Sequence, residues 1–164
     1  MIGGRAAEIA PLAAYCGLLA VAVATDVRDL RIPNFVPLFV ALLFVPAALL
    51  SPGPVDWASH LAAAAISLAV GVGLFAWGKL GGGDVKLIAA VALWQGLKLL
   101  PAFVLLIGIV GGIAAVLCLL LRWAGLGRFL AARGADLMAL RAGADIPYAV
   151  AIAGAAGLML LVPQ

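Results

Sequence analysis

Long apolar runs separated by short polar segments dominate the chain. Residues 7–25 are apolar apart from Glu8, and the run ends at Thr25 and Asp26. A helix that crosses a bilayer needs about 20 such residues, with a range of about 17–25. On this criterion the chain predicts an all-α, polytopic membrane bundle of about six transmembrane helices in a single domain over residues 1–164. The expected helices are at about 7–25, 35–50, 58–77, 85–97, 100–121 and 146–162.

One apolar run, from residue 85 to residue 121, is too long for a single span. Gly96, Lys98 and Pro101 lie near its middle. Glycine and proline are the residues that most often interrupt a helix. We therefore expect a break there, with a short fourth helix before it and a full fifth helix after it.

The composition also indicates a membrane environment. Of the 164 residues, 67% are hydrophobic and 10% are charged, whereas soluble domains carry about 45–50% apolar and about 25% charged residues. A soluble fold of this size would have too few polar side chains to cover its surface. The first apolar run is not followed by a cleavage site and a polar mature domain, so it reads as a permanent span rather than a signal peptide. The expected surroundings are the lipid bilayer, and nothing indicates a nucleic-acid partner.

Basic residues are distributed unevenly among the connections. In a six-span bundle, the connections 26–34, 78–86 and 122–145 lie on one side, and the other side holds only Arg5 and Lys98. Short cytoplasmic loops carry an excess of Lys and Arg. The three connections are therefore expected to be cytoplasmic, with both termini outside the cytoplasm. Their eight basic residues are Arg28, Arg31, Lys79, Lys86, Arg122, Arg128, Arg133 and Arg141.

Two aspartates lie at the ends of expected spans on that same side. Asp26 directly follows the first apolar run, and Asp84 directly precedes the fourth. A carboxylate at the membrane boundary is unfavourable unless it is solvated or paired, so such acids are candidates for function. Three glycines, Gly81, Gly82 and Gly83, precede Asp84 and would let an extended peptide approach its carboxylate. Taken singly, Asp84 can also be a helix N-cap after a glycine turn, and Asp26 an incidental acid in a basic turn.

Together the two segments are more specific than either alone. Asp26, followed by an Arg-rich turn and Ile32-Pro33-Asn34, resembles the first motif of the type IV prepilin peptidases. The three glycines and Asp84, with Lys86, resemble the second motif of that family, GxGD. The order of the motifs and the six-helix layout are also similar, most of all to the short form that serves Flp-type (tight-adherence) pili. Longer members add an N-terminal methyltransferase region with a cysteine-rich loop. These 164 residues contain no counterpart, so N-methylation of pilins is not expected.

The resemblance implies an aspartic endopeptidase that removes the basic leader peptide from pilin-like precursors at the cytoplasmic face of a bacterial inner membrane. Asp26 and Asp84 would be its catalytic pair. Two carboxylates held close together share a proton, and their pKa values separate. The ionised one would activate water as a general base, and the protonated one would polarise the scissile carbonyl. Which aspartate is the base stays open, because such a pair titrates as a unit.

Further residues are expected to shape this site. Lys86 would stabilise an ionised Asp84, orient the adjoining turn or act as a positively charged membrane anchor. Pro33 and Asn34 would shape the turn into the second helix or contact the substrate. Asp145, in a segment Asp145-Ile146-Pro147-Tyr148 that adds to the resemblance, is expected as the N-cap of the sixth helix or, as an alternative, as a residue that lines the site.

No metal and no organic cofactor are expected. The two cysteines, Cys16 and Cys118, lie in separate apolar runs, and the chain has no CxxC pair. The single histidine, His60, lies near the outer side and offers no partner ligand.

Two other classes of function are weighed against the peptidase. In a small proton-coupled transporter, Asp26 and Asp84 would relay protons. Against this, both acids map to one face rather than to mid-span, and no inverted repeat is visible. In a non-catalytic membrane subunit of a pilus or secretion assembly, replacement of either aspartate would have no effect. Among enzymes, a preflagellin or general intramembrane GxGD protease is a further option. Ile32-Pro33-Asn34 favours the bacterial prepilin type over the presenilin-like one. The sequence does not indicate an oligomeric state.

Overall fold

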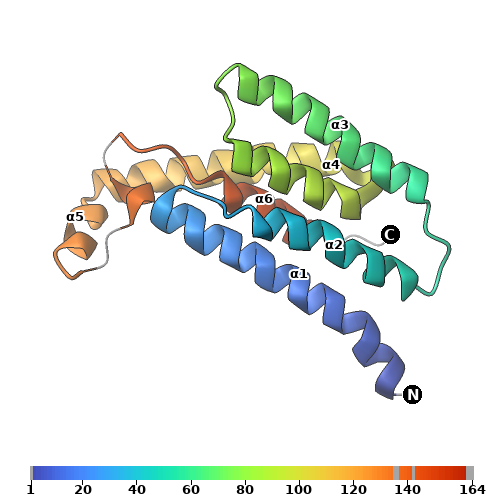
Figure 1. Ribbon diagram of the computed structural model, residues 1–164. Coiled ribbons are helices and arrows are strands. Elements are labelled where there is room, and N and C mark those ends of the chain that lie inside the picture. The colour runs from blue at the N-terminus through green and yellow to red at the C-terminus, as the bar shows by residue number, and fades with distance from the viewer. Residues whose placement is uncertain (1, 135–136, 142, 162–164) are drawn as a thin grey trace.

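The structure, a computed structural model, describes residues 2–134, 137–141 and 143–161 and contains only helices over these ranges (Figure 1). The all-α fold expected from the sequence is therefore confirmed. Residues 135, 136 and 142 of the expected loop 122–145, and residue 162 of the expected last helix, lie outside the described residues. In chain order the elements are α1 (Ile2–Asp29), α2 (Phe35–Leu49), α3 (Trp57–Ala76), α4 (Gly82–Trp123), α5 (Leu126–Ala131), the short 3₁₀ helix η1 (Met138–Leu140) and α6 (Tyr148–Met159).

The ends of several helices differ from the expected bounds. Helix α1 continues past Thr25, so Asp26 lies in its last turn rather than in a loop. The helix stops when Leu30 adopts a left-handed backbone with φ 50°. Helix α4 already begins at Gly82, which places Asp84 in its first turn. The expected loop 122–145 is also partly helical, because α5 and η1 form inside it.

Helix α4 contains the expected break, and Gly96 is the residue that makes it. Gly96 has φ 67° and ψ 174°, a conformation that is essentially restricted to glycine. The N–H of Leu97 would pair with the carbonyl of Leu93 in a continuous helix, but it donates to Ser59 Oγ at 2.9 Å. The carbonyl of Leu93 accepts instead from His60 Nδ1 at 2.7 Å. Helix α3 thus supplies partners for two backbone groups at the break.

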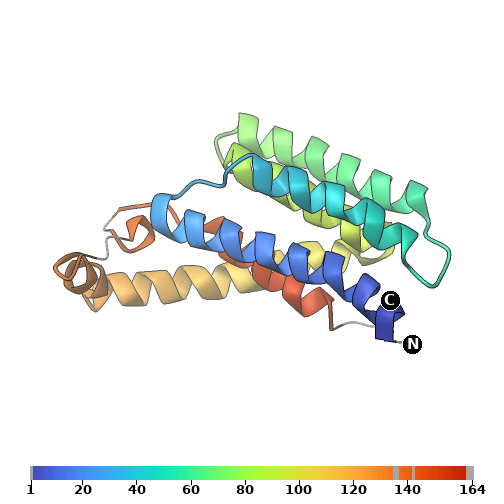
Figure 2. The ribbon, with the colours of Figure 1, turned by 60° about the horizontal axis from the view of Figure 1, so that its bottom comes forward.

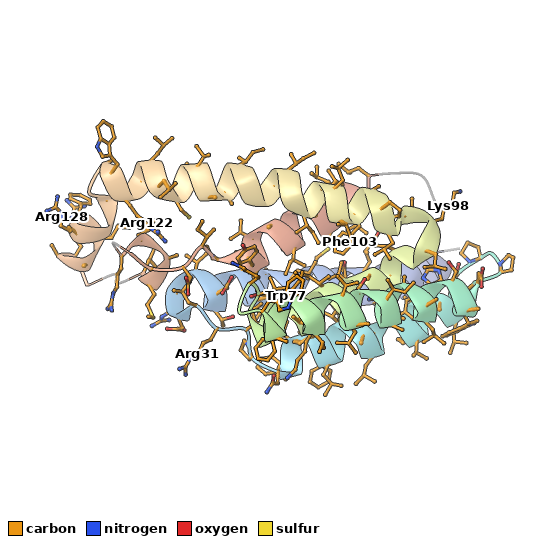
Figure 3. The ribbon with its side chains drawn as sticks, turned by 90° about the horizontal axis from the view of Figure 1, so that it is seen from above. Arg31, Trp77, Lys98, Phe103, Arg122 and Arg128 are labelled. Carbon is orange, nitrogen blue, oxygen red and sulfur yellow. The ribbon has the colours of Figure 1, made fainter. Side chains whose placement is uncertain are left out.

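Because of this break, the two halves of α4 run in nearly opposite directions, and successive helices alternate along the bundle (Figures 1 and 2). The connection after α1, the connection before α4 and the segment from α5 to α6 all lie toward one end. The α2–α3 connection, the break and the beginning of α1 lie toward the other. Figure 3 shows the same division, with Arg31, Arg122 and Arg128 toward one end and Lys98 at the other. Successive helices therefore alternate in direction, as the sequence-based assignment of the basic connections to one side assumed.

Helix α4 is the centre of the packing, with α2, α3 and α6 all against it, while α1 packs on α2 and α6. Small residues allow the closest approaches. A Cβ atom at Gly71 would lie 2.7 Å from Val85, and one at Gly154 would lie 2.8 Å from Val110. The buried cluster that joins the helices includes Tyr15, Leu19, Val36, Val40, Leu87, Val91, Phe103, Ile152 and Met159.

An aromatic group joins the first four helices near the break in α4. The ring centroids of Tyr15 and Trp94 lie 4.4 Å apart. The ring centroid of Phe44 lies 6.0 Å from that of Trp94 and 4.9 Å from that of His60. The indole N–H of Trp94 also donates to the carbonyl of Val40 at 2.9 Å. These contacts hold α1, α2 and α3 around the residues that precede Gly96.

The outer surface of the bundle is apolar. Leu61, Leu105 and Ile113 are each more than half exposed, as are many other large apolar side chains. Within the described residues, three helical segments are long and apolar enough to cross a membrane, namely Ala10–Asp29, Trp57–Ala76 and Gly82–Trp123. The apolar helices α2 and α6 are shorter. Such an exposed surface requires an apolar solvent, so the molecule is a helical membrane bundle.

The conformation of Gly96 leads to a stability prediction. We expect Gly96→Ala to lower the free energy of unfolding by about 1–3 kcal/mol, because alanine is strained at this φ and ψ. Its Cβ would also lie 3.2 Å from Ser59 Oγ. Gly108→Ala is the matched control on the same helix, since nothing lies within 4 Å of a Cβ there. Unfolding of both variants in detergent measures the difference, and equal stabilities would contradict the role assigned to Gly96.

Candidate active site

A polar cleft of about 540 Å³ opens at the end of the bundle that carries the basic residues. Its walls come from the last turn of α1, the connection between α3 and α4, the first turn of α4, the end of α4 and the segment that leads into α6. The lining residues are Asp26, Leu30, Phe75, Gly78, Lys79, Leu80, Gly81, Asp84, Arg122, Ala144, Asp145, Ile146 and Tyr148. Segments far apart in the sequence thus meet around two carboxylates.

The first carboxylate belongs to Asp26, which is only 6% exposed. Its Oδ2 accepts a hydrogen bond of 2.8 Å from the backbone N–H of Ala149. Ala149 is the second residue of α6, so this N–H has no acceptor within its own helix. The positive end of a helix dipole also favours a negative charge. Helix α6 therefore stabilises the carboxylate of Asp26 from the opposite end of the chain.

The second carboxylate belongs to Asp84, in the first turn of α4. It turns back toward the residue before the helix and interacts with the backbone N–H groups of Gly81 and of Asp84 itself. A Cβ at position 81 would lie only 2.6 Å from Asp84 Oδ2. Gly81, rather than Asp84, is the N-cap residue of α4. The glycine at this position leaves room for the carboxylate to occupy the end of the helix.

The two carboxylates are near neighbours in the cleft. Both line it, and the charge on Asp26 acts on Asp84. Each also interacts with backbone N–H groups at the beginning of a helix, Asp26 with α6 and Asp84 with α4. Two helix N-termini thus converge on one pair of acids.

The other two glycines of the motif have different surroundings. A Cβ at Gly83 would lie 3.1 Å from Ile32 Cβ and 3.4 Å from the carbonyl oxygen of Ile32. A Cβ at Gly82 would make only an ordinary contact, 3.5 Å from the ring of Phe75. Gly83 therefore lets the connection after α1 approach the first turn of α4.

Three of the residues expected to shape the site lie outside the cleft. Lys86 Nζ donates to Asn34 Oδ1 at 2.8 Å, so Lys86 orients the turn before α2. Both residues line a separate apolar groove between α2, α3 and α4. Pro33 lines another hollow with Thr25 and Met138. Of the expected site residues, Asp26, Asp84, Gly81 and Asp145 line the polar cleft, and the others do not.

The C-terminal part of the chain contributes residues that sequence reasoning missed. Arg122 and Tyr148 line the cleft, and Ala149 binds Asp26. Asp145 also lines the cleft, but Pro147 is the N-cap residue of α6, so the expected N-cap role of Asp145 is wrong. The chain enters α6 in an extended conformation at Pro147, with φ −70° and ψ 104°, and Asp145 lies two residues before this cap.

Among the residues that the structure describes, no three His, Cys, Asp or Glu side chains come together in a group that could hold a metal ion. The charged and ionisable side chains of the cleft are Asp26, Asp84, Asp145, Lys79, Arg122 and Tyr148. The chemistry that this set offers is acid–base chemistry by paired carboxylates.

Comparison with known proteins gives a consistent result. The sequence model of the Type IV leader peptidase family matches residues 13–116. The prepilin leader peptidase/N-methyltransferase of Bacillus subtilis (strain 168) is 37% identical over 119 residues, which cover 70% of this chain and 48% of that protein. The chain thus spans about half the length of this relative. No solved structure matches the chain.

The matched residues include both aspartates and all three glycines of the second motif, and they cover more than half of the chain. On these findings, the chain belongs to the type IV leader peptidase family.

Proposed function

We propose that this chain is a membrane aspartic endopeptidase in which Asp26 and Asp84 cleave the leader peptide from a pilin-like precursor. The observation that supports the proposal most is the pair of carboxylates in one polar cleft at the end of an otherwise apolar bundle. Buried acids at a membrane boundary are unfavourable unless they serve a function or are paired, and membership of a leader peptidase family supplies that function.

The reaction needs one negative charge and one proton on the pair. The ionised carboxylate takes a proton from a water molecule, which attacks the scissile carbonyl. The protonated carboxylate polarises that carbonyl and then helps to protonate the leaving amine. The N–H of Ala149 stabilises a charge on Asp26, and the N–H groups at the start of α4 stabilise a charge on Asp84. A single charge shared by the pair is therefore tolerated in this largely apolar structure.

The position of the cleft suits a substrate with a basic leader followed by an apolar helix. An apolar helix within the bilayer would present its leader junction at a membrane surface, and the cleft lies where several helices of the bundle end. Gly81 leaves the approach to Asp84 free of side-chain bulk. Asp145 also lines the cleft, together with Lys79 and Arg122.

The same proposal places the protein in a bacterial inner membrane, with the cleft facing the cytoplasm and both termini outside it. The distribution of Lys and Arg supports this orientation. Eight of the ten lie in the connections 26–34, 78–86 and 122–145, and short cytoplasmic loops carry an excess of basic residues.

The central prediction concerns the two aspartates. Asp26→Asn and Asp84→Asn should each lower the rate of leader removal by roughly 10²–10⁴-fold, the usual contribution of a general acid or base. The measurement is the N-terminus of a pilin precursor co-expressed with each variant, with the membrane abundance of each variant determined in parallel. Asp29→Asn is the matched control, since Asp29 is exposed in the same turn of α1 and does not line the cleft.

Normal processing by either aspartate variant would remove that residue from the catalytic pair. If both variants supported processing, the proton-relay and non-catalytic assembly functions would replace the peptidase.

A second prediction separates two adjacent glycines. Gly81→Ala should reduce cleavage strongly, because its Cβ would displace the Asp84 carboxylate, whose Oδ2 lies 2.6 Å from that position. The backbone at Gly81, with φ −72° and ψ 146°, accepts alanine without strain, so folding is expected to be retained. Gly82→Ala introduces only an ordinary contact and should retain most of the activity. Equal activity of the two variants in the precursor assay would count against the placement of Asp84.

A third prediction tests the orientation. In a background with Cys16→Ala and Cys118→Ala, Arg31→Cys should react with a membrane-impermeant maleimide only after the cells are permeabilised. Ser51→Cys, in the connection between α2 and α3, should react in intact cells. The reverse pattern would place the cleft outside the cytoplasm and contradict the proposal that the leader is cleaved at the cytoplasmic face.

A further inference from the structure

Arg122 makes contacts that no part of the proposed chemistry uses. It lies near the end of α4, where its Nε and Nη2 donate to the carbonyl of Ala139 at 3.0 and 2.7 Å. Nη2 also donates to the carbonyl of Asp145 at 2.9 Å. One guanidinium group therefore binds two backbone carbonyls of the segment that precedes α6. Figure 3 shows Arg122 directed from the end of α4 toward this segment.

The segment that Arg122 binds, here called the strap (residues 137–141 and 143–147), leads directly into the active site. Ala139 and Leu140 of the strap are buried, and η1 packs against both α1 and α4. A Cβ at Gly127 would collide with the carbonyl oxygen of Leu140, so α5 also lies close to the strap. The strap ends at Pro147, two residues before Ala149, whose N–H binds Asp26.

We propose that Arg122 is a positioning residue, which holds the strap so that the first turn of α6 meets Asp26. The proposal rests on the proposed function, because it concerns the same pair of carboxylates. Arg122 itself also lines the cleft. It acts on the reaction through the strap rather than by contact with the scissile bond.

The residue type supports the assignment. A guanidinium group presents several donors in a rigid plane, so it can bind two carbonyls at once. An ammonium group keeps the charge but is a compact donor that does not reproduce this geometry. Arg122→Lys should therefore retain only part of the positioning effect, whereas Arg122→Ala should lose all of it.

The test compares Arg122→Ala and Arg122→Lys with Arg133→Ala. Arg133 belongs to the same connection, but its guanidinium lies over the ring of Phe129 at 4.2 Å and does not line the cleft. Arg122→Ala should lower kcat for a pilin precursor by about 10–10²-fold, as expected when a catalytic group is misplaced by about 1 Å, with little change in KM. Arg122→Lys should lie between Arg122→Ala and wild type, and Arg133→Ala should match wild type.

Two further readouts distinguish positioning from a general loss of stability. The acid limb of the pH–activity profile should move to higher pH in Arg122→Ala, because Asp26 loses the fixed N–H donor of Ala149 that favours its charged form. Hydrogen exchange of the peptide that contains Ala149 should be faster in Arg122→Ala than in wild type, while exchange in the rest of α4 stays slow. An unchanged pH profile, or exchange at Ala149 that equals wild type, would overturn the proposal.

The exchange measurement needs no substrate, so it separates this proposal from the proposed function. If the wild-type protein failed to cleave any precursor but the Ala149 peptide still exchanged faster in Arg122→Ala, the peptidase assignment would fall and the positioning contact would stand.

Discussion

A carboxylate enclosed in an apolar helix bundle must obtain hydrogen-bond donors from the protein, and this requirement organises the active end of the molecule. Asp26 obtains its donor from Ala149, at the N-terminus of α6. Helix α6 must therefore begin at the level where α1 ends, and the chain before it must be held in place. Arg122 does this by binding two carbonyls of the strap. The first and last helices of the bundle are thus tied together by the buried carboxylate of Asp26.

The break at Gly96 is the second constraint, because it divides one apolar run into two helices that run in opposite directions. The first half of α4 is short and carries Asp84 at its beginning, whereas the second half returns to the cleft and carries Arg122 near its end. Both ends of α4 therefore contribute to the same cleft. The break is stable because Ser59 and His60 pair with the backbone groups of Leu97 and Leu93 that it leaves free. A polar pair at one end of α3 thereby supports the arrangement of residues at the other end of the bundle.

The match to the leader peptidase family and the structure describe overlapping but different parts of the site. The family match ends at residue 116 and includes both aspartates, while Arg122, Tyr148 and Ala149 lie beyond it. The physical role of that C-terminal part is to supply donors and to close one side of the cleft. A site defined by the two motifs alone would leave Asp26 without its hydrogen bond.

The sequence by itself determined the membrane bundle, the break near Gly96 and the two aspartates, because apolar runs, glycine in a helix and acids at span ends are local signals. It placed Asp26 and Asp84 at one end through the alternation of spans. Only the tertiary structure decided that Lys86 binds Asn34, that His60 pairs with the backbone of Leu93, and that Arg122 holds the strap. Each of these side chains binds a partner that is distant in the sequence. A backbone carbonyl carries no residue-type signature, so the acceptors of His60 and Arg122 become visible only when the helices are packed.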